Sequence, residues 1–375
     1  MRDLPPGPVR VQLFLGPVVP IPVPQALLEC LTDIKIEANA GDVQSGFELT
    51  FLVPRDTPIQ LLLPVDIPVL RCVVAVTLRG STTVLIDGLV THHDATANGP
   101  STTLHVKGKD LTAVMDLIPL TGLPYPAMPP FLRVLICLAK YALLGCVPLV
   151  IPSIIPDIPI PTDQIPQHKG TDLAYIRQLA AEVGHTFYID PGPVPGVSKA
   201  YWGPEIRLGV PQPALNIGLG NHIDNVTTLT MTMDKEKKEM PLVFIQERTS
   251  HVPIPIPIPD LSPLSPPLGV IPPLPPKIHK MEKTANDRPT TAIMKGIAYA
   301  AQHQDSVFGQ GTLDVAKYGN ILLPRKLVGV RGTGIAYDGL YYVTKVVHEI
   351  KRGSFTQQFS LARNGLLSTV PSVPA

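Results

Sequence analysis

Three consecutive side chains, His92, His93 and Asp94, offer the groups used by metal sites and by acid-base catalysis. The surrounding sequence predicts a β-strand, in which neighbouring side chains point to opposite faces. The two imidazoles would therefore not converge on one ion or one substrate. We interpret the three residues as a surface cluster at the end of a hairpin.

Two Asp-Gly dipeptides, Asp87-Gly88 and Asp338-Gly339, could supply a pair of carboxylates. Between apolar strands, however, Asp-Gly indicates a turn or a bulge. The stretch Arg331-Gly-Thr-Gly334 resembles a phosphate loop only in its glycines, because the Lys-Ser/Thr pair and the following helix are missing. The sequence also has no Gly-x-Ser-x-Gly elbow. We predict no catalytic residue, no metal site and no cofactor, and hence no enzyme.

The four cysteines, Cys30, Cys72, Cys137 and Cys146, lie in apolar stretches without Cys-x-x-Cys spacing. Such cysteines are typical of free thiols in a reducing compartment. We therefore expect neither a disulfide framework nor a metal ribbon.

An internal repeat shows how the elements around these motifs are organised. An Arg-Gly pair, an Asp-Gly-Leu triplet, a β-rich stretch with a histidine and then a Ser/Thr-rich alternating strand occur twice in this order. The first copy includes Arg79-Gly80, Asp87-Gly88-Leu89, His92 and 101–106, and the second includes Arg331-Gly332, Asp338-Gly339-Leu340, His348 and 354–361. The copies are too far apart for a solenoid, whose repeats recur every ~20 to 50 residues. They predict two similar β-modules in one chain, an arrangement that can match an odd symmetry to an even one.

Composition favours a protein that assembles with partners. The 375 residues include 45 prolines, only 16% charged residues and 5% aromatic residues, which suits a β-rich chain better than a helical or disordered one. Residues 1–275 carry 18 Lys and Arg against 24 Asp and Glu, whereas residues 276–375 carry 13 against 6. This asymmetry fits docking on charged neighbours or a plain solvated gradient, and it is too weakly basic to indicate nucleic acid.

Periodicity predicts a mainly β fold with an α+β insertion: two similar small antiparallel β-barrel modules and an inserted α/β region. Helices are expected at 110–117, 130–144, 171–183 and 289–301. The predicted divisions are a proline-rich arm (1–29), the first module (30–117), the insertion (118–222), the second module (223–251 with 318–367), a proline-rich linker with a short helix (252–317) and a tail (368–375). In 252–276, where 11 of 25 residues are proline, we expect a stiff extended segment that lies along another surface.

Two stretches carry a family resemblance. The sequence from Thr171 to Ala180, with Gly184 and 187–190, looks like the signature helix and strand of phage late control gene D proteins and of the N-terminal region of VgrG proteins. The sequence from Tyr337 to Leu361 is similar to the end of the same hub proteins. The resemblance covers roughly 30–367. Unlike in VgrG, we expect no oligonucleotide-fold domain and no β-helix needle after this region.

The resemblance implies a trimeric baseplate hub that joins a hexameric inner tube to a spike, here a separate chain, with wedge proteins around it. It also implies assembly in the cytoplasm and a final place in a phage tail-like particle. As interface candidates we choose paired motif residues and two linker prolines: Arg79, Asp87, Gly88, Arg331, Asp338, Gly339, Pro255 and Pro257. Two alternatives stay open: a tail-associated cell-wall hydrolase, and an adaptor that associates with a membrane through 131–151. Because Arg133 and Lys140 interrupt that apolar stretch, we expect no stable membrane insertion.

Overall fold

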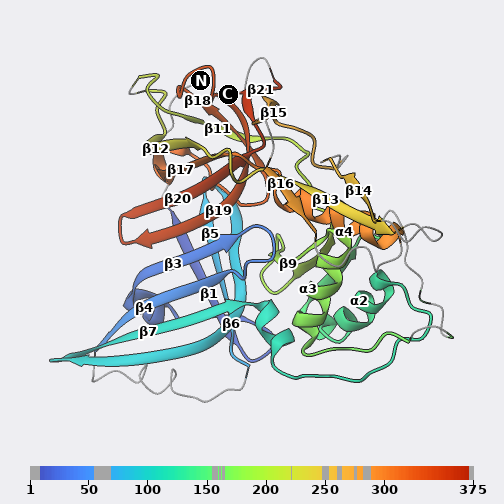
Figure 1. Cartoon of the computed structure of the whole chain (residues 1–375). Helices are drawn as coiled ribbons and strands as arrows, with labels where there is room; N and C mark the ends of the chain where they lie inside the picture. The colour runs from blue at the N-terminus through green and yellow to red at the C-terminus, as the bar shows by residue number, and fades with distance from the viewer. Residues whose placement is uncertain are drawn as a thin grey trace.

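A computed structural model describes residues 9–54, 69–153, 159, 162, 165–220, 222–246, 253–259, 264–273, 277–281 and 289–370. Strands dominate, and Figure 1 shows one large curved sheet beside a helical region. This arrangement confirms the predicted mainly β class with an inserted α/β part.

The large sheet has 13 strands and draws on both ends of the chain. Its main path runs β12-β17-β20-β19-β3-β4-β7-β6-β5-β1-β2, and β18 lies beside β19 and pairs with β11. These strands are β1 (Arg10–Gly16), β2 (Ile21–Pro22), β3 (Leu31–Asn39), β4 (Gly46–Pro54), β5 (Arg71–Leu78), β6 (Ser81–Asn98), β7 (Ser101–Asp110), β11 (Gln212–Asn216), β12 (Val226–Met233), β17 (Val307–Asp314), β18 (Leu327–Arg331), β19 (Gly339–Lys351) and β20 (Ser354–Arg363).

One hydrophobic core runs along this sheet. Side chains of early strands, such as Ile36 and Phe51, belong to the same buried cluster as Val346 and Phe359 from late strands. The short helices α1 (Gln25–Cys30) and α5 (Val315–Tyr318) add Leu27 and further side chains to it. The two halves of the chain therefore fold around a shared interior.

The inserted region lies between β7 and β11 and has its own core. Its elements are η2 (Leu111–Asp116), α2 (Pro130–Ala139), η3 (Ala142–Leu144), β8 (Cys146–Val150), α3 (Asp172–Val183), β9 (Thr186–Pro191) and β10 (Ser198–Gly203). Helix α3 begins where the Thr171 hydroxyl accepts a hydrogen bond from the Ala174 amide, and it ends at Gly184 in the left-handed conformation. Its apolar face packs around Trp202, which is fully buried.

A third region combines α4 (Pro289–Gln302) with two small sheets. One sheet has the order β14-β13-β16, with β13 (Glu239–Gln246), β14 (Pro253–Pro257) and β16 (Lys277–Lys280), and the other pairs β15 (Gly269–Ile271) with β21 (Leu366–Ser368). Helix α4 packs closely on β13, because a Cβ at Gly296 would lie 2.7 Å from the Val243 side chain. In the described part of the chain, no helix has the length and apolarity needed to span a membrane.

Several predicted boundaries need correction. Residues 10–30 are not a free arm, because β1 pairs along its length with β5. The expected linker 252–317 contains β17, which is a strand of the large sheet. Conversely, β13 falls within the predicted second module but lies outside the large sheet. Among the described residues, no strand pairing closes either half into a separate barrel, since β3 and β19 join the halves into one sheet. Residues 1–8 and 371–375 lie outside the described residues.

Where the structure describes it, the proline-rich segment contains two short extended strands, β14 and β15, and each belongs to a small sheet. Pro255 and Pro257 lie in β14 opposite Phe244 and Leu242 of β13. Within the described residues β14 pairs on one side only, which is the position that proline tolerates because it has no backbone donor.

Candidate assembly surface

The large sheet contains the same strand order twice. The order β3-β4-β7-β6-β5-β1 in the first half matches β12-β17-β20-β19-β18-β11 in the second. Only the last pairing differs, since β1 is antiparallel to β5 whereas β11 is parallel to β18. The predicted duplication is therefore present in the topology.

Irregularities in the ladders show which residues are equivalent. In the β6–β7 hairpin the register shifts between Val90 and His92, and in the β19–β20 hairpin it shifts between Val343 and Lys345. The residue at each bulge is a threonine whose hydroxyl donates to a carbonyl of the partner strand: Thr91 to Lys107 and Thr344 to Ser360. Thr91 and Thr344 are thus equivalent.

A second pair of bulges aligns the other ends of the two halves. The ladder of β3 and β4 shifts between Leu31 and Asp33, and that of β12 and β17 shifts between Val226 and Thr228. Thr32 and Thr227 occupy these bulges. Strand β12 is therefore the counterpart of β3.

This alignment corrects the register of the sequence repeat. Counting from the bulge threonines places Lys345 at His92 and His348 at Ala95, so the two motif histidines are not equivalent. Asp87 and Gly88 lie inside β6 rather than in a turn, whereas Asp338 precedes β19. The repeat was right about the strands and wrong about the residue pairs.

The two halves are joined edge to edge within the chain. Strand β3 pairs antiparallel with the second part of β19, from Asn39 opposite Lys345 to Asp33 opposite Lys351. Ile36 and Val346, which face the core from this joint, are fully buried. The joint is thus a continuous, dry part of the sheet.

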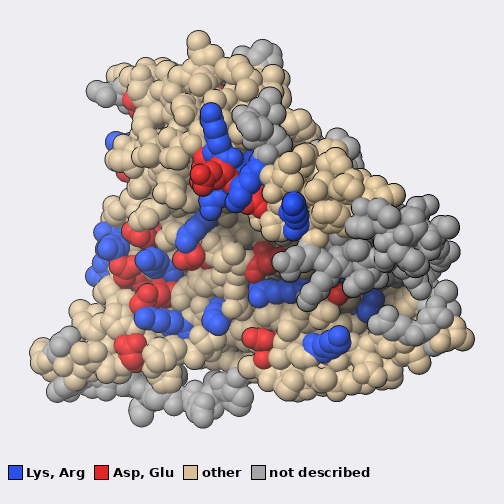
Figure 2. Space-filling model, viewed as in Figure 1, with Lys and Arg blue, Asp and Glu red and all other residues tan. Residues whose placement is uncertain are grey.

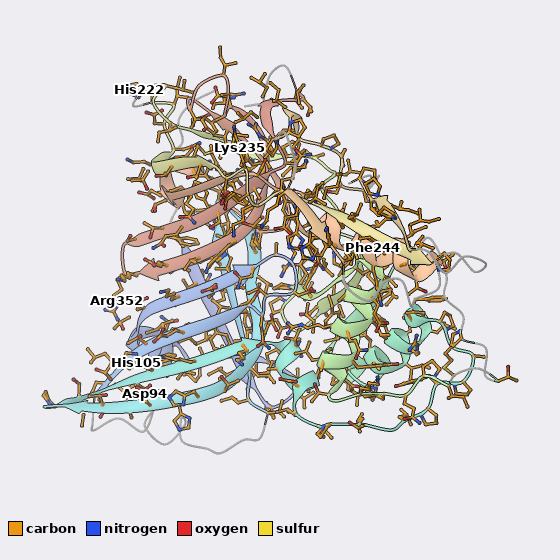
Figure 3. All side chains as sticks on the ribbon, in the orientation of Figure 1. Asp94, His105, His222, Lys235, Phe244 and Arg352 are labelled. Carbon is orange, nitrogen blue, oxygen red and sulfur yellow. The ribbon has the colours of Figure 1, made fainter. Side chains whose placement is uncertain are left out.

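In the part of the chain that the structure describes, the equivalent edge of each half has no further strand partner. Among the described residues, β12 pairs only with β17, and the second part of β6, from His92 onward, pairs only with β7. Ala95, Thr96 and Ala97 are exposed there. Figure 3 labels Asp94 on β6 low in the view and Lys235, which follows β12, near the top.

One face of the sheet carries a row of alternating charges. Glu349, Lys35, Glu48 and Lys107 lie directly opposite one another on four neighbouring strands, and His92 follows next to Lys107. Figure 2 shows acidic and basic side chains interleaved over this region. Because exposed ion pairs contribute only about 0–1 kcal/mol each, the row matters more for matching of surfaces than for stability.

The predicted candidate Asp87 lies inside the subunit. Its side chain is 1% exposed, and Arg71 binds it through two hydrogen bonds of 2.6 and 2.7 Å. The guanidinium also donates to the carbonyl oxygens of Val18 and Gly196, and the Ser198 hydroxyl donates to Asp87. This network ties β5 and β6 to the inserted region. Next to it, a Cβ at Gly88 would lie 2.2 Å from the Lys109 carbonyl oxygen, so glycine is needed for this close approach.

Apart from the two prolines of β14, the remaining candidates lie in turns or at strand ends. Arg79 is exposed in the β5–β6 turn with φ +51°, and its guanidinium lies over Gly319. Asp338 accepts hydrogen bonds from the amide and hydroxyl of Thr333, and Gly339 has φ +136°. Arg331 ends β18 and is half-buried. None of these residues lies on an open edge, so their role in assembly stays a prediction.

The histidine cluster has the geometry expected of a surface. His92 and His93 are exposed, and His92 lies 3.6 Å from Asp94 on the same face of β6. A second cluster that the sequence analysis missed, formed by Cys137, His168 and Asp172, is buried in the inserted region. There the Asp172 carboxylate already accepts hydrogen bonds from Lys140 and Tyr141, and burial raises the pKa of the Cys137 thiol to about 11. A metal would need the thiolate, so the cluster fits an internal hydrogen-bond network better.

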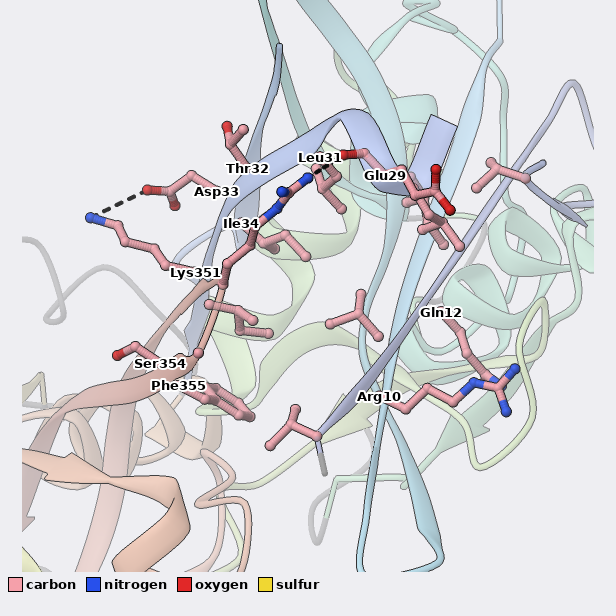
Figure 4. Close-up of a pocket in the computed structure, with 18 of the residues that line it drawn as sticks. Arg10, Gln12, Glu29, Leu31, Thr32, Asp33, Ile34, Lys351, Ser354 and Phe355 are labelled. Carbon is pink, nitrogen blue, oxygen red and sulfur yellow. Dashed lines mark hydrogen bonds and ion pairs between the residues drawn. The ribbon is translucent and has the colours of Figure 1, made fainter. Parts of the chain in front are cut away.

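A cavity of about 1150 Å³ opens where the two halves meet. Strands β1 and β3, helix α1 and the β19–β20 turn line it, as Figure 4 shows. Leu13, Ile34 and Phe355 form an apolar floor, and the Asp33–Lys351 ion pair lies at the rim. The position of the cavity marks the joint between the halves.

Comparison with known proteins agrees with this architecture. No protein-family model and no curated protein sequence matches the chain. Among solved structures, a tail protein from Neisseria meningitidis is similar with a TM-score of 0.63 and 12% identity, covering 96% of this chain and 98% of that one. A 43 kDa tail protein of prophage MuSo2 from Shewanella oneidensis has a TM-score of 0.63 and 13% identity over 95% of this chain and 99% of its own.

A longer chain from another complex contains the same fold. A chain of the Francisella PdpA-VgrG complex has a TM-score of 0.60 and 10% identity, and the match covers 99% of this chain but 60% of that one. At these identities the similarity concerns the backbone arrangement. The chain therefore has the fold of these two tail proteins and of part of a chain of the PdpA-VgrG complex.

Proposed function

We propose that the chain is the structural hub of a contractile, phage tail-like baseplate. In this proposal three copies form a ring that joins a hexameric inner tube to a separate spike, with wedge proteins around it. The hub assembles in the cytoplasm and then becomes part of the particle. It has no enzymatic role, does not bind nucleic acid directly and does not insert stably into a membrane.

The observation that carries this proposal is the edge-to-edge joint between two equivalent halves. A contact that joins the front of one module to the back of the next generates a ring when its rotation closes. Each chain already contains one such contact, between β3 and β19. Three chains would supply six similar modules, which suits a sixfold partner.

The hairpin ends support a contact with that partner. The β6–β7 and β19–β20 hairpins are equivalent, and in Figure 1 both extend toward the same side of the molecule. A ring of three chains would present six such ends on one rim. Both open edges would then lie between copies rather than toward the tube.

The mass of the assembled particle tests this proposal. We expect native mass spectrometry of the full chain, alone or co-expressed with its tube protein, to show a particle with the mass of three chains. When the turns of the β6–β7 and β19–β20 hairpins are both replaced, the particle should still have the mass of three chains but should no longer bind the tube protein. A chain that remains single at every concentration, with and without the tube protein, would rule the hub out.

A further inference from the structure

The structure points to a specific contact between copies. We propose that β12 of one copy pairs antiparallel with the second part of β6 in the next copy, in the register that β3 and β19 use within one chain. This inference rests on the proposed function, since it assumes that copies meet through equivalent edges. The inference specifies which strands of the two copies pair and which residues lie opposite each other.

The register follows from the equivalences. Because Lys345 lies opposite Asn39 in the chain, His92 is expected opposite Asp234 of the next copy. In the same way Ala95 lies opposite Met231 and Asn98 opposite Thr228. The contact thus has the length of the joint inside the chain.

Side chains on the two open edges are more exposed than their counterparts in the joint inside the chain. Ala95 and Ala97 are exposed, whereas their counterparts His348 and Ile350 are 0% and 7% exposed. On the other edge, Met231 is half-buried, whereas its counterpart Ile36 is fully buried. A strand pairing at these edges would complete the core that the joint inside the chain already has.

Side-chain sizes match across the proposed contact. Leu229, Met231 and Met233 of β12 would meet Ala97, Ala95 and His93 of β6, so large apolar side chains lie mostly opposite small ones. In the joint inside the chain the volume is shared differently, with Ile34 opposite Ile350. Tightly packed interfaces need such complementary volumes, because both voids and overpacking cost free energy.

The charged row also continues across the contact. Its alternation runs from Glu349 through Lys35 and Glu48 to Lys107, with His92 next. Asp234 of the next copy would take the following place and set an acidic group beside His92 and Lys107. A shift of the register by one residue would turn the apolar side chains of β12 to the other face, which favours the proposed register.

Two of the residue types that protect free edges, lysine and proline, are missing from both edges. Natural proteins also use bulges and other charged side chains for this purpose, and here bulges lie at Thr91 and Thr227, at the start of the two segments, and Asp94 lies within the β6 segment. The outer strands β2 and β14 contain prolines, whereas β12 (Val226–Met233) and the β6 segment 91–98 contain neither lysine nor proline. Edges left open in this way suit pairing with a second copy of the chain.

Engineered disulfides test both the pairing and its register. Residues directly opposite each other on antiparallel strands have Cα atoms about 4.5–5.5 Å apart, within disulfide reach, whereas positions shifted by two residues are about 7–8 Å apart. Three exposed threonines of β12, at 228, 230 and 232, share one face and form a matched series. Chains carrying only Thr96→Cys are mixed with chains carrying only Thr228→Cys, Thr230→Cys or Thr232→Cys and then oxidised.

We expect the Thr230→Cys mixture to give at least about tenfold more crosslinked dimer than either shifted mixture, because only that pair is directly opposite. The wild-type chain, with its four free cysteines, gives the background. Equal or stronger crosslinking in a shifted mixture would overturn the proposed contact but not the hub proposal. The same holds if no mixture gives a crosslink although the wild-type particle has the mass of three chains. A wild-type protein that stays a single chain would overturn the hub proposal itself. If the tube protein alone occupies both edges, the edges bind the tube protein and not a second copy of the chain.

Discussion

A charge placed on the open β6 edge should prevent assembly without harming the fold. Ala95 is exposed in the single chain, so Ala95→Glu leaves a solvated carboxylate there. Its counterpart His348 is 0% exposed, which shows how completely a neighbouring strand covers this position. On assembly the carboxylate would be buried opposite Met231 with no partner.

The magnitude follows from that burial. Leaving one uncompensated charge in a dry interface costs about 3–5 kcal/mol, which corresponds to at least a hundredfold weaker contact. Sedimentation velocity should show the variant as single chains at concentrations where the wild type is assembled. At concentrations low enough for both to be single chains, the urea midpoints of the two should be the same. Ala142→Glu makes the same change on an exposed residue of the inserted region and should assemble normally. An assembled Ala95→Glu variant would refute the reasoning.

Other predictions concern the subunit itself. Asp87→Ala should lower the free energy of unfolding by about 3–5 kcal/mol because it strands the buried Arg71, and the double variant with Arg71→Met should recover most of the loss in urea unfolding; equal losses in both would contradict an uncompensated charge. Burial lowers the pKa of His348 from 6.5 to about 3, so the unfolded chain takes up a proton first and stability falls as pH drops below 6.5. Between pH 6.5 and about 5, His348→Gln should therefore lose about 2 kcal/mol less than the wild type, and parallel pH profiles would argue against a neutral buried histidine. Gly88→Ala should cost about 1–3 kcal/mol through its clash with the Lys109 carbonyl oxygen, and an unchanged urea midpoint would contradict that close approach.

Local signals in the sequence were sufficient for several elements. The apolar spacing from 171 onward and the glycine at 184 correctly predicted α3, and the proline at the start of α2 predicted where that helix begins. The repeat indicated two similar sets of strands. These features depend on neighbouring residues, which is why a single sequence contains them.

Long-range pairing was not accessible in the same way. The prolines near the N-terminus suggested a free arm, yet β1 has a seven-residue alternating stretch that pairs with β5 far along the chain. The match between His92 and His348 concealed the true register, because the bulge threonines Thr91 and Thr344 define it only once the ladders are known. The open edges likewise become visible only when each strand's partners are known.

Averaged electron-microscope images of the assembled chain, viewed along the ring axis, test the central claim most directly. We expect threefold symmetry with six similar lobes at one level. Around the ring, contacts between the two halves of one chain should alternate with contacts between neighbouring chains. Two halves of a chain at different levels along the axis, or a twofold particle, would contradict the account.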